Sequence, residues 1–186
     1  MKRMRVISTV LCVMMLGLVS VSAQKGANFA GTWELDKSKS QLPQMMAEMI
    51  QSMSWTVTQD DKQVTREQKM ERNPNAQPPG GGGGGGGGRG GGGMMGGGGP
   101  MTVKLDGSET VTENPRGKST MKAKWTNDGK TLEITTVRNM STPNGDFSLT
   151  TTEHWELADG GKTLKVHQST ETPQGAREST MVFTKK

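Results

Sequence analysis

The chain has 186 residues and a formal net charge of +5, and it is rich in Gly, with 27, but only 4% aromatic. Its single cysteine, Cys12, excludes an intramolecular disulfide, so the core alone must hold the fold. The sequence has two histidines and no pattern of nucleophile, base and orienting group, which predicts a binding protein and not an enzyme, with no cofactor.

Residues 1–23 are predicted to form a signal peptide. Three basic residues precede an apolar run at 6–19, which is shorter than the roughly 20 residues needed to span a bilayer, and a small-residue cleavage site ends at Ala23. Removing three of the 23 basic residues leaves 20 against 18 acidic ones, so the mature net charge is +2. This charge gives no strong attraction to nucleic acid or membranes. We expect a secreted or periplasmic monomer that binds no nucleic acid and does not stay inserted in a membrane.

Ten β-strands are predicted from alternating, Thr- and Val-rich segments separated by turn sequences. Asn127-Asp-Gly-Lys130 and Asp159-Gly-Gly-Lys162 are such turns, because Asp-Gly favours tight hairpins. The strands are expected at residues 29–35, 54–59, 63–72, 101–105, 108–113, 117–125, 131–139, 146–157, 163–172 and 176–184.

One segment between the first two strands is predicted to be helical. Residues 43–53 contain good helix formers, and Met45, Met49 and Met53 recur at a spacing of four. Together with Met46 and the methionines at 94, 95 and 101, these thioethers could bind Cu(I), but an apolar lid that adapts to varied ligands is the favoured interpretation.

The Gly-rich stretch from Pro78 to Pro100 could be a linker, a nucleic-acid-binding tract or a loop within one domain. Before it, the mature chain holds only three short strands and one helix, too little for a separate core. One arginine and no aromatic residue argue against nucleic-acid binding. We therefore predict one domain, residues 24–186, with a disordered insertion at 74–100.

Sequential antiparallel strands with short turns predict an up-and-down meander that closes into a barrel, because closure removes exposed strand edges. The expected fold class is all-β, a single antiparallel barrel of about ten strands with a helical lid between strands 1 and 2. Alternation makes one end of the interior apolar, lined by Leu132, Ile134, Trp155, Leu157, Leu164, Val166, Phe183 and Trp125. The predicted ligand-binding residues line the other end: Arg138, Thr151, Glu153, Gln168, Thr170 and Arg177, with Met49 and Met53 of the lid.

The hairpin turns also predict a register between the last strands. The expected cross-strand neighbours are Trp155–Val166, Glu153–Gln168, Val166–Phe183 and Thr170–Ser179. Inward polar groups without partners would cost about 1–3 kcal/mol each. Pairing of Arg138 or Arg177 with Glu153, water, or a bound ligand would each satisfy them.

His154 and His167 fall opposite each other on the outer face in this register. Two histidines without a nearby third carboxylate or thiolate make a poor metal site, so a solvated face is favoured and no metal is predicted.

The segment Phe29-Ala-Gly-Thr-Trp33 is similar to the G-x-W opening of lipocalins, and the whole pattern resembles the calycins, the lipocalin and fatty-acid-binding-protein group. The phrase Phe-x-Gly-Thr-Trp-x-Leu-Asp-x-x-Lys-Ser also resembles secreted bacterial lipocalin-like proteins. The resemblance implies that Trp33 packs at the closed end, where Trp125 and Trp155 are further structural residues. Where the fatty-acid-binding branch has Arg-x-Tyr, this chain has Arg177-Glu178-Ser179, and no Arg near the end of the last strand is available to cover Trp33.

These observations lead to one expected function and one alternative. The expected function is binding of a small apolar or amphipathic molecule inside the barrel. The alternative is a structural or interaction barrel of the cell envelope that holds no ligand.

Overall fold

The computed structural model describes residues 26–76, 99–114, 117–142, 145–172 and 175–186. The signal peptide predicted at 1–23 and most of the Gly-rich stretch lie outside the described residues. The elements in chain order are β1 (Gly31–Leu35), α1 (Gln44–Met49), β2 (Ile50–Gln59), β3 (Gln63–Arg72), β4 (Met101–Lys104), β5 (Thr110–Asn114), β6 (Gly117–Thr126), β7 (Thr131–Thr142), β8 (Gly145–Ala158), β9 (Thr163–Thr172) and β10 (Gly175–Lys185).

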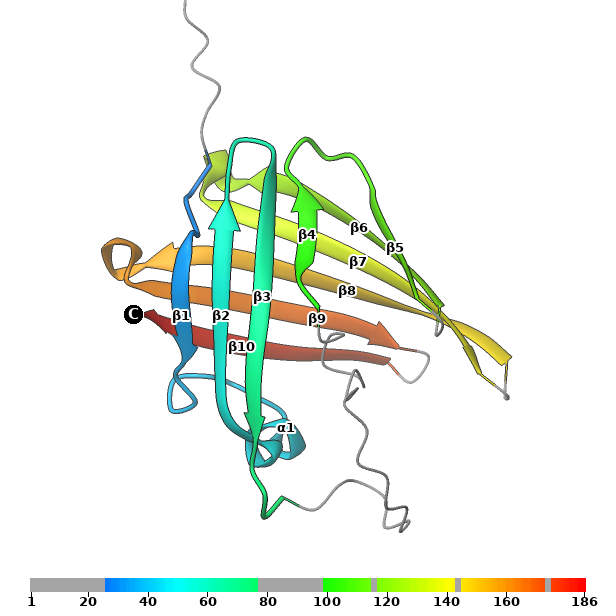
Figure 1. Cartoon of the computed structure of the whole chain (residues 1–186), viewed down its shortest axis with the longest axis horizontal. Helices are drawn as coiled ribbons and strands as arrows, with labels where there is room; N and C mark the ends of the chain where they lie inside the picture. Colours follow the sequence, from blue (N-terminus) through cyan, green and yellow to red (C-terminus); the bar gives the residue numbers. More distant parts are fainter. Residues whose placement is uncertain (1–25, 77–98, 115–116, 143–144, 173–174) are drawn as a thin grey trace, which may run out of the picture.

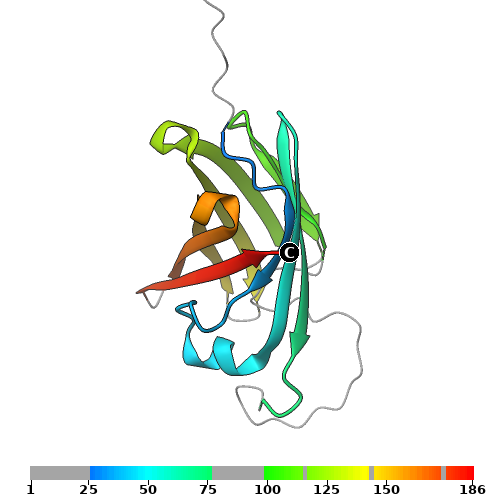
Figure 2. The same ribbon diagram turned by 90° about the vertical axis from the view of Figure 1, so that its left-hand side faces the viewer.

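All ten strands belong to one antiparallel sheet with the order β4-β3-β2-β1-β10-β9-β8-β7-β6-β5. Figure 1 shows β1 to β4 crossing in front of β6 to β10, and Figure 2 shows the two layers facing each other. The predicted all-β meander with a helix between the first two strands is confirmed.

The predicted antiparallel barrel is nearly closed, and its two end strands are β4 and β5. The described parts of β4 and β5 stand at the two ends of the sheet order and share no strand pairing. One long hydrogen bond connects them among the described residues, from the backbone N–H of Lys104 to Thr110 Oγ1 at 3.4 Å. β4 has four residues, so it is too short to bridge the whole length of the wall.

The helix is shorter than predicted, so Met53 lies in strand β2 and not in the helix. α1 ends at Met49, and the chain from Ile50 onward is strand β2, with Ile50 opposite Arg72 of β3. The β-branched Ile50 is fully buried, so its burial in the sheet outweighs the helix propensity of the segment. Met53 therefore lies in the core at 5% exposure, and Met45, at 53%, projects from the helix into solvent.

Large aromatic side chains fill the closed end of the barrel. Trp33, Trp55, Trp155, Phe29 and Phe183 are at most 1% exposed. Each ring removes about 150–250 Å² from water, at about 25 cal/mol per Å², so this cluster is a main stabilising contribution. Trp55 contacts two other rings of the cluster, with its ring centroid 4.3 Å from that of Phe183 and 5.3 Å from that of Trp155.

Trp33 is covered by a lysine that the sequence analysis missed. The Nζ atom of Lys185 lies 5.2 Å from the centroid of the Trp33 ring, and Trp33 Nε1 donates to the carbonyl oxygen of Phe29 at 2.8 Å. The last strand thus supplies the cation over Trp33 although it has no arginine there.

The register between β8 and β9 is as predicted, with Trp155 opposite Val166 and Glu153 opposite Gln168. The prediction for β9 and β10 was wrong by two residues, because Thr172 pairs directly with Gly175 and the connection is shorter than expected. The observed neighbours are Val166–Met181, Leu164–Phe183 and Thr170–Arg177.

Candidate functional site

Polar side chains line the inner wall above the aromatic cluster. They lie in two rows that cross β7 to β10, because directly opposite residues of an antiparallel pair point to the same face. The members of these rows are Thr136, Thr151, Thr170 and Arg177 in one, and Ile134, Glu153, Gln168 and Ser179 in the other. Of the polar members, all but Arg177 are half-buried, so the wall is neither packed shut nor part of the outer surface.

Glu153 is paired with Arg66, a residue that the sequence analysis did not select. Arg66 lies on β3 in the opposite wall, and its Nη1 atom is 3.0 Å from Glu153 Oε2. The two side chains are only 12% and 13% exposed. The expected internal partners of Glu153, Arg138 and Arg177, are therefore replaced by an arginine that reaches across the barrel.

The ion pair lies directly on the aromatic cluster. The guanidinium carbon of Arg66 is 4.3 Å from the centroid of the Trp55 ring and 5.7 Å from that of Trp155. Trp155 Nε1 donates to Glu153 Oε2 at 2.8 Å, and Trp55 Nε1 donates to Gln68 Oε1 at 3.1 Å. Arg66, Glu153, Trp55 and Trp155 thus form a layer across the barrel, here called the floor, in which the positive and the negative charge balance. The apolar closed end lies on one side of this floor and the polar half of the barrel on the other.

Above this floor the polar wall includes hydroxyl and amide contacts. Thr151 Oγ1 and Thr170 Oγ1 are 3.2 Å apart, and Gln168 Nε2 donates weakly to Thr170 Oγ1 at 3.4 Å. Arg138 follows on the same inner face, opposite Ser119 of β6 and Leu149 of β8. It is half-buried and makes no hydrogen bond or ion pair with any residue of the described ranges.

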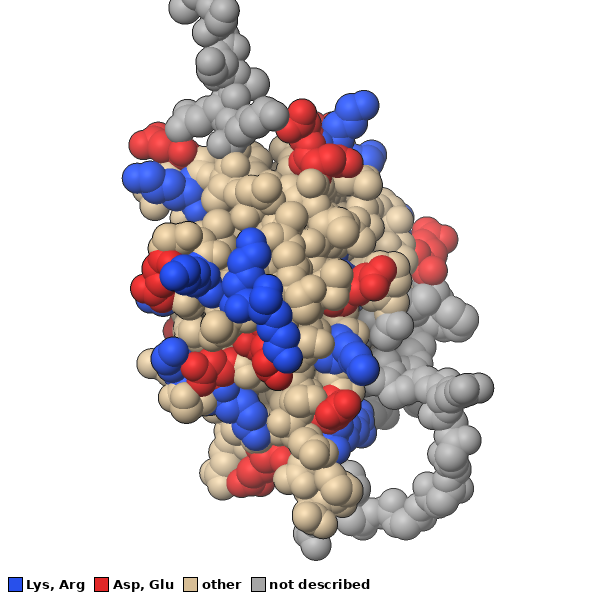
Figure 3. Space-filling view, turned by 60° about the vertical axis from the view of Figure 1, so that its left-hand side comes forward, with Lys and Arg blue, Asp and Glu red and all other residues tan. Residues whose placement is uncertain are grey.

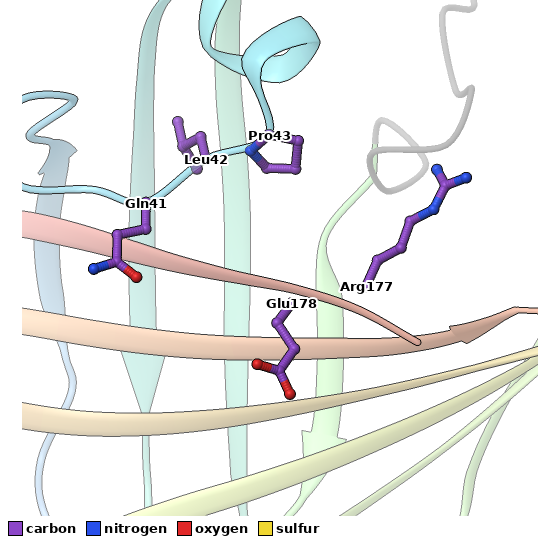
Figure 4. A pocket seen from close by; sticks show the side chains of 5 residues that line it. All are labelled: Gln41, Leu42, Pro43, Arg177 and Glu178. Atoms are coloured by element: carbon purple, nitrogen blue, oxygen red, sulfur yellow. The ribbon is translucent and has the colours of Figure 1, made fainter. Parts of the chain in front are cut away.

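Arg177 lies at the rim and not beside the other predicted contacts. It is exposed, and it borders a groove of about 570 Å³ between the start of β10 and the chain that leads into α1. The groove is lined by Gln41, Leu42, Pro43, Arg177 and Glu178, shown in Figure 4. Beside the groove, Gln41 and Thr180 pair through both backbone groups, and the chain then enters α1 at Pro43.

The end of α1 is tied to the end of β3 at the same rim. The backbone N–H of Asn73 donates to the carbonyl oxygen of Met49 at 2.9 Å, and Asn73 Nδ2 donates to that of Glu48 at 3.1 Å. Of the two predicted lid methionines, half-buried Met49 is thus near the mouth, while Met53 belongs to the core.

The three structural tryptophans lie at the closed end. Trp33 and Trp155 are fully buried, and Trp125 is partly buried with its ring stacked at 6.0 Å on that of Phe29. Within the described part of the chain, every buried side-chain nitrogen or oxygen atom has a hydrogen-bond partner. The core therefore does not depend on a ligand to satisfy its polar groups.

The outer face carries the two histidines. His154 and His167 are directly opposite, as predicted, and their ring centroids are 6.4 Å apart. The described residues include no group of three or more His, Cys, Asp or Glu side chains placed to hold a metal, and none of their helices has the length and apolar character needed to cross a membrane. On the face shown in Figure 3, basic and acidic side chains are interspersed.

Comparison with known proteins finds likeness in structure but not in sequence. No protein-family model matches the chain, and no curated protein sequence matches it. A crystal structure of a secretary abundant heat soluble (SAHS) protein from Ramazzottius varieornatus is similar, with a TM-score of 0.50 and 10% identity over 88% of this chain and 98% of that chain. Zebrafish ileal bile acid-binding protein complexed with cholic acid has a TM-score of 0.46 and 14% identity, over 86% of this chain and 100% of that chain. The chain thus resembles this SAHS protein in its fold, and the likeness extends to the fold alone.

The residues that sequence reasoning missed carry a recognisable signal. Val64, Arg66, Gln68 and Met70 alternate along β3 in the same way as the inward sets of the later strands. Extending the alternation argument to this strand would have placed Arg66 and Gln68 inside the barrel. It would not have identified Glu153 as the partner, because the two residues lie on opposite walls.

Proposed function

We propose that the protein binds a small amphipathic molecule in the polar half of its barrel. The observation that carries the proposal is the half-buried wall of β7 to β9 above a floor sealed by Arg66 and Glu153. Threonine methyl groups and the exposed edge of the floor would contact an apolar body, and Arg138 would orient a polar or anionic end. The groove at Leu42, Pro43 and Arg177 would be the entrance.

Titration with a lipophilic, sulfonate-bearing fluorescent probe tests this proposal. Thr151→Phe places a ring in the lumen and should abolish saturable binding. Thr152→Phe, one residue later on the outer face of β8 opposite Ser169, is the matched control and should bind as wild type. Arg138→Ala should weaken binding by roughly 10- to 100-fold, because a hydrogen bond to a charged group contributes about 1.5–3 kcal/mol.

Two results would contradict the binding proposal: no saturable binding to the folded wild type, or equal effects of Thr151→Phe and Thr152→Phe. The first would support the alternative, a structural or interaction barrel of the cell envelope. That alternative is favoured by one observation, that the buried polar groups of the described residues are satisfied without a ligand.

We further propose that the protein is exported and that its mature form begins at Gln24. The basic, apolar and small-residue segments of 1–23 support this, and the intact mass of the exported protein checks it. A relation to secreted bacterial lipocalin-like proteins stays a prediction from the Phe29–Trp33 segment. Catalysis is not part of the proposal, since the site offers a wall for binding and no reacting group beside a base.

A further inference from the structure

The chain's two histidines are held side by side on the outer face of two central strands. His154 of β8 is directly opposite His167 of β9, and the ladder between these strands runs without a register shift from Thr150 to Ala158. Both strands are also paired on their other sides, so the backbone cannot separate the two rings. Their centroids are 6.4 Å apart, with an angle of 32° between the ring planes.

This separation is close to that of two imidazoles on one metal ion. Metal–nitrogen bonds of about 2.0–2.1 Å at a tetrahedral angle put two ring centroids roughly 5 Å apart. Small side-chain rotations of the two half-exposed or exposed rings would cover the difference. The His154 side chain is 38% exposed, so a cation can reach it from solvent.

One nitrogen of each ring already contacts a polar side chain of a flanking strand, β7 for His154 and β10 for His167. His154 Nε2 is 3.3 Å from Glu133 Oε2 on β7, and His167 Nδ1 is 3.2 Å from Thr180 Oγ1 on β10. Metal-ligating histidines characteristically have their second ring nitrogen held in this way by a carboxylate or another acceptor, which orients the ring. His154 Nδ1 and His167 Nε2 are left as the coordinating atoms.

Glu133 supplies the carboxylate that the sequence did not place near the pair. Lys124 Nζ is 2.8 Å from Glu133 Oε1. Lys124 thus binds one carboxylate oxygen of Glu133, and the other oxygen, Oε2, faces His154 Nε2. In the adjacent row, Glu156 is opposite Lys165 and accepts a hydrogen bond from Thr131 Oγ1 at 2.8 Å.

We propose that His154 and His167 form a surface site for a divalent cation that prefers imidazole, such as Zn²⁺, Ni²⁺ or Cu²⁺, with Glu133 and Thr180 as positioning residues. The site has two protein ligands, and water completes the coordination shell, which agrees with the lack of a three-ligand cluster among the described residues. The site is on the opposite face of the sheet from the barrel interior, so it does not rest on the proposed ligand binding.

The test uses the untagged chain, because an affinity tag would add histidines. Calorimetric titration with ZnCl₂, NiCl₂ or CuCl₂ should show one saturable site per chain. Since the chain has two histidines, NMR should show both imidazole signals changing together on Zn²⁺ addition. His154→Asn and His167→Asn should each weaken binding by at least about tenfold, which corresponds to about 1.4 kcal/mol.

Two matched carboxylate variants separate the proposed site from general cation attraction. Glu133→Gln should weaken binding by about tenfold, as expected for loss of a group that orients a ligating histidine. Glu156→Gln removes the same charge from the neighbouring row and should leave affinity unchanged. Circular dichroism and thermal melts of every variant show whether the barrel is folded.

Four outcomes would overturn the inference. These are no saturable binding of any of the three cations, unchanged affinity in both histidine variants, an equal loss in Glu156→Gln and Glu133→Gln, or one metal per two chains. The last would place the cation between copies and not within one outer face.

Discussion

Arg66 and Glu153 place a buried ion pair in the middle of the barrel interior. They come from walls that face each other, and their ion pair is nearly nine-tenths buried. A buried pair of this kind costs desolvation on both sides and is stabilising only when hydrogen bonds complete it. Trp155 Nε1 supplies one such bond, and the Trp55 ring supplies a cation–π surface.

Removing one charge of the pair should destabilise the fold more than removing both. Glu153→Gln leaves the guanidinium of Arg66 uncompensated and should lower the free energy of unfolding by about 3 kcal/mol. Arg66→Met combined with Glu153→Leu should cost clearly less than Arg66→Met alone or Glu153→Leu alone, because no isolated charge remains. Urea unfolding followed by tryptophan fluorescence measures every variant. Additive losses in the double variant would show that the two residues do not act as a pair.

At the scale of the element, the hairpins depend on glycine at a few strand ends. Gly117 begins β6 opposite Met140 with a φ of 139°, and a Cβ there would collide with the backbone carbonyl oxygen of Asn139. Gly145 begins β8 with a φ of 116°, but a Cβ there would meet nothing within 4 Å. Both positions have a positive φ, and they differ in the space around them.

This pair of glycines provides a matched test of close approach between strands. Gly145→Ala should lower stability by about 1–2 kcal/mol, the usual cost of a positive φ for a residue with a side chain. Gly117→Ala should cost at least about 1 kcal/mol more, since the atom it meets belongs to a paired backbone and cannot rotate away. Thermal unfolding of both variants gives the comparison. Equal losses would mean that β6 and β7 can shift apart without penalty.

In two segments the observed structure differs from the local secondary-structure propensity. Residues 50–53 have good helix formers, yet they lie in β2, where Ile50 and Met53 join the core. The segment from Asp36 to Gln41 has no strand signal, yet it runs along β10, with Ser40 Oγ accepting from the backbone N–H of Val182 at 2.9 Å. In both cases contacts made only in the folded barrel outweigh propensity.

At the scale of the whole molecule, β3 and β4 pair directly although 28 residues, 73–100, separate them in the chain. We propose that residues 24–186 form one domain and that the Gly-rich stretch is an insertion in it. Deleting residues 80–99 should leave the barrel folded and raise stability by about 1 kcal/mol, because a loop of about 8 residues costs less closure entropy than one of 28. Circular dichroism and the thermal midpoint of the deletion variant test this. An unfolded variant would contradict the placement.

The interior of the barrel was predictable in part. The alternation of β7 to β10 was enough to place Thr151, Glu153 and Gln168 on the inner wall. Arg177 shares that face by alternation but lies at the rim and is exposed, beside the groove at Pro43. Alternation along a strand tells which face of the sheet a residue occupies. Whether that face is buried depends on how far the opposite wall of the barrel extends over it.

The sequence by itself determined the strands, the Asp-Gly turns and the inward and outward faces, because these follow from backbone geometry over a few residues. It also determined that the histidines are opposite, since one short turn sets the register of β8 and β9. Only the tertiary structure decided that Arg66 meets Glu153 and that Lys185 covers Trp33. Each of these contacts depends on how the sheet curves or on a register set by packing of whole strands, and neither is encoded in local spacing.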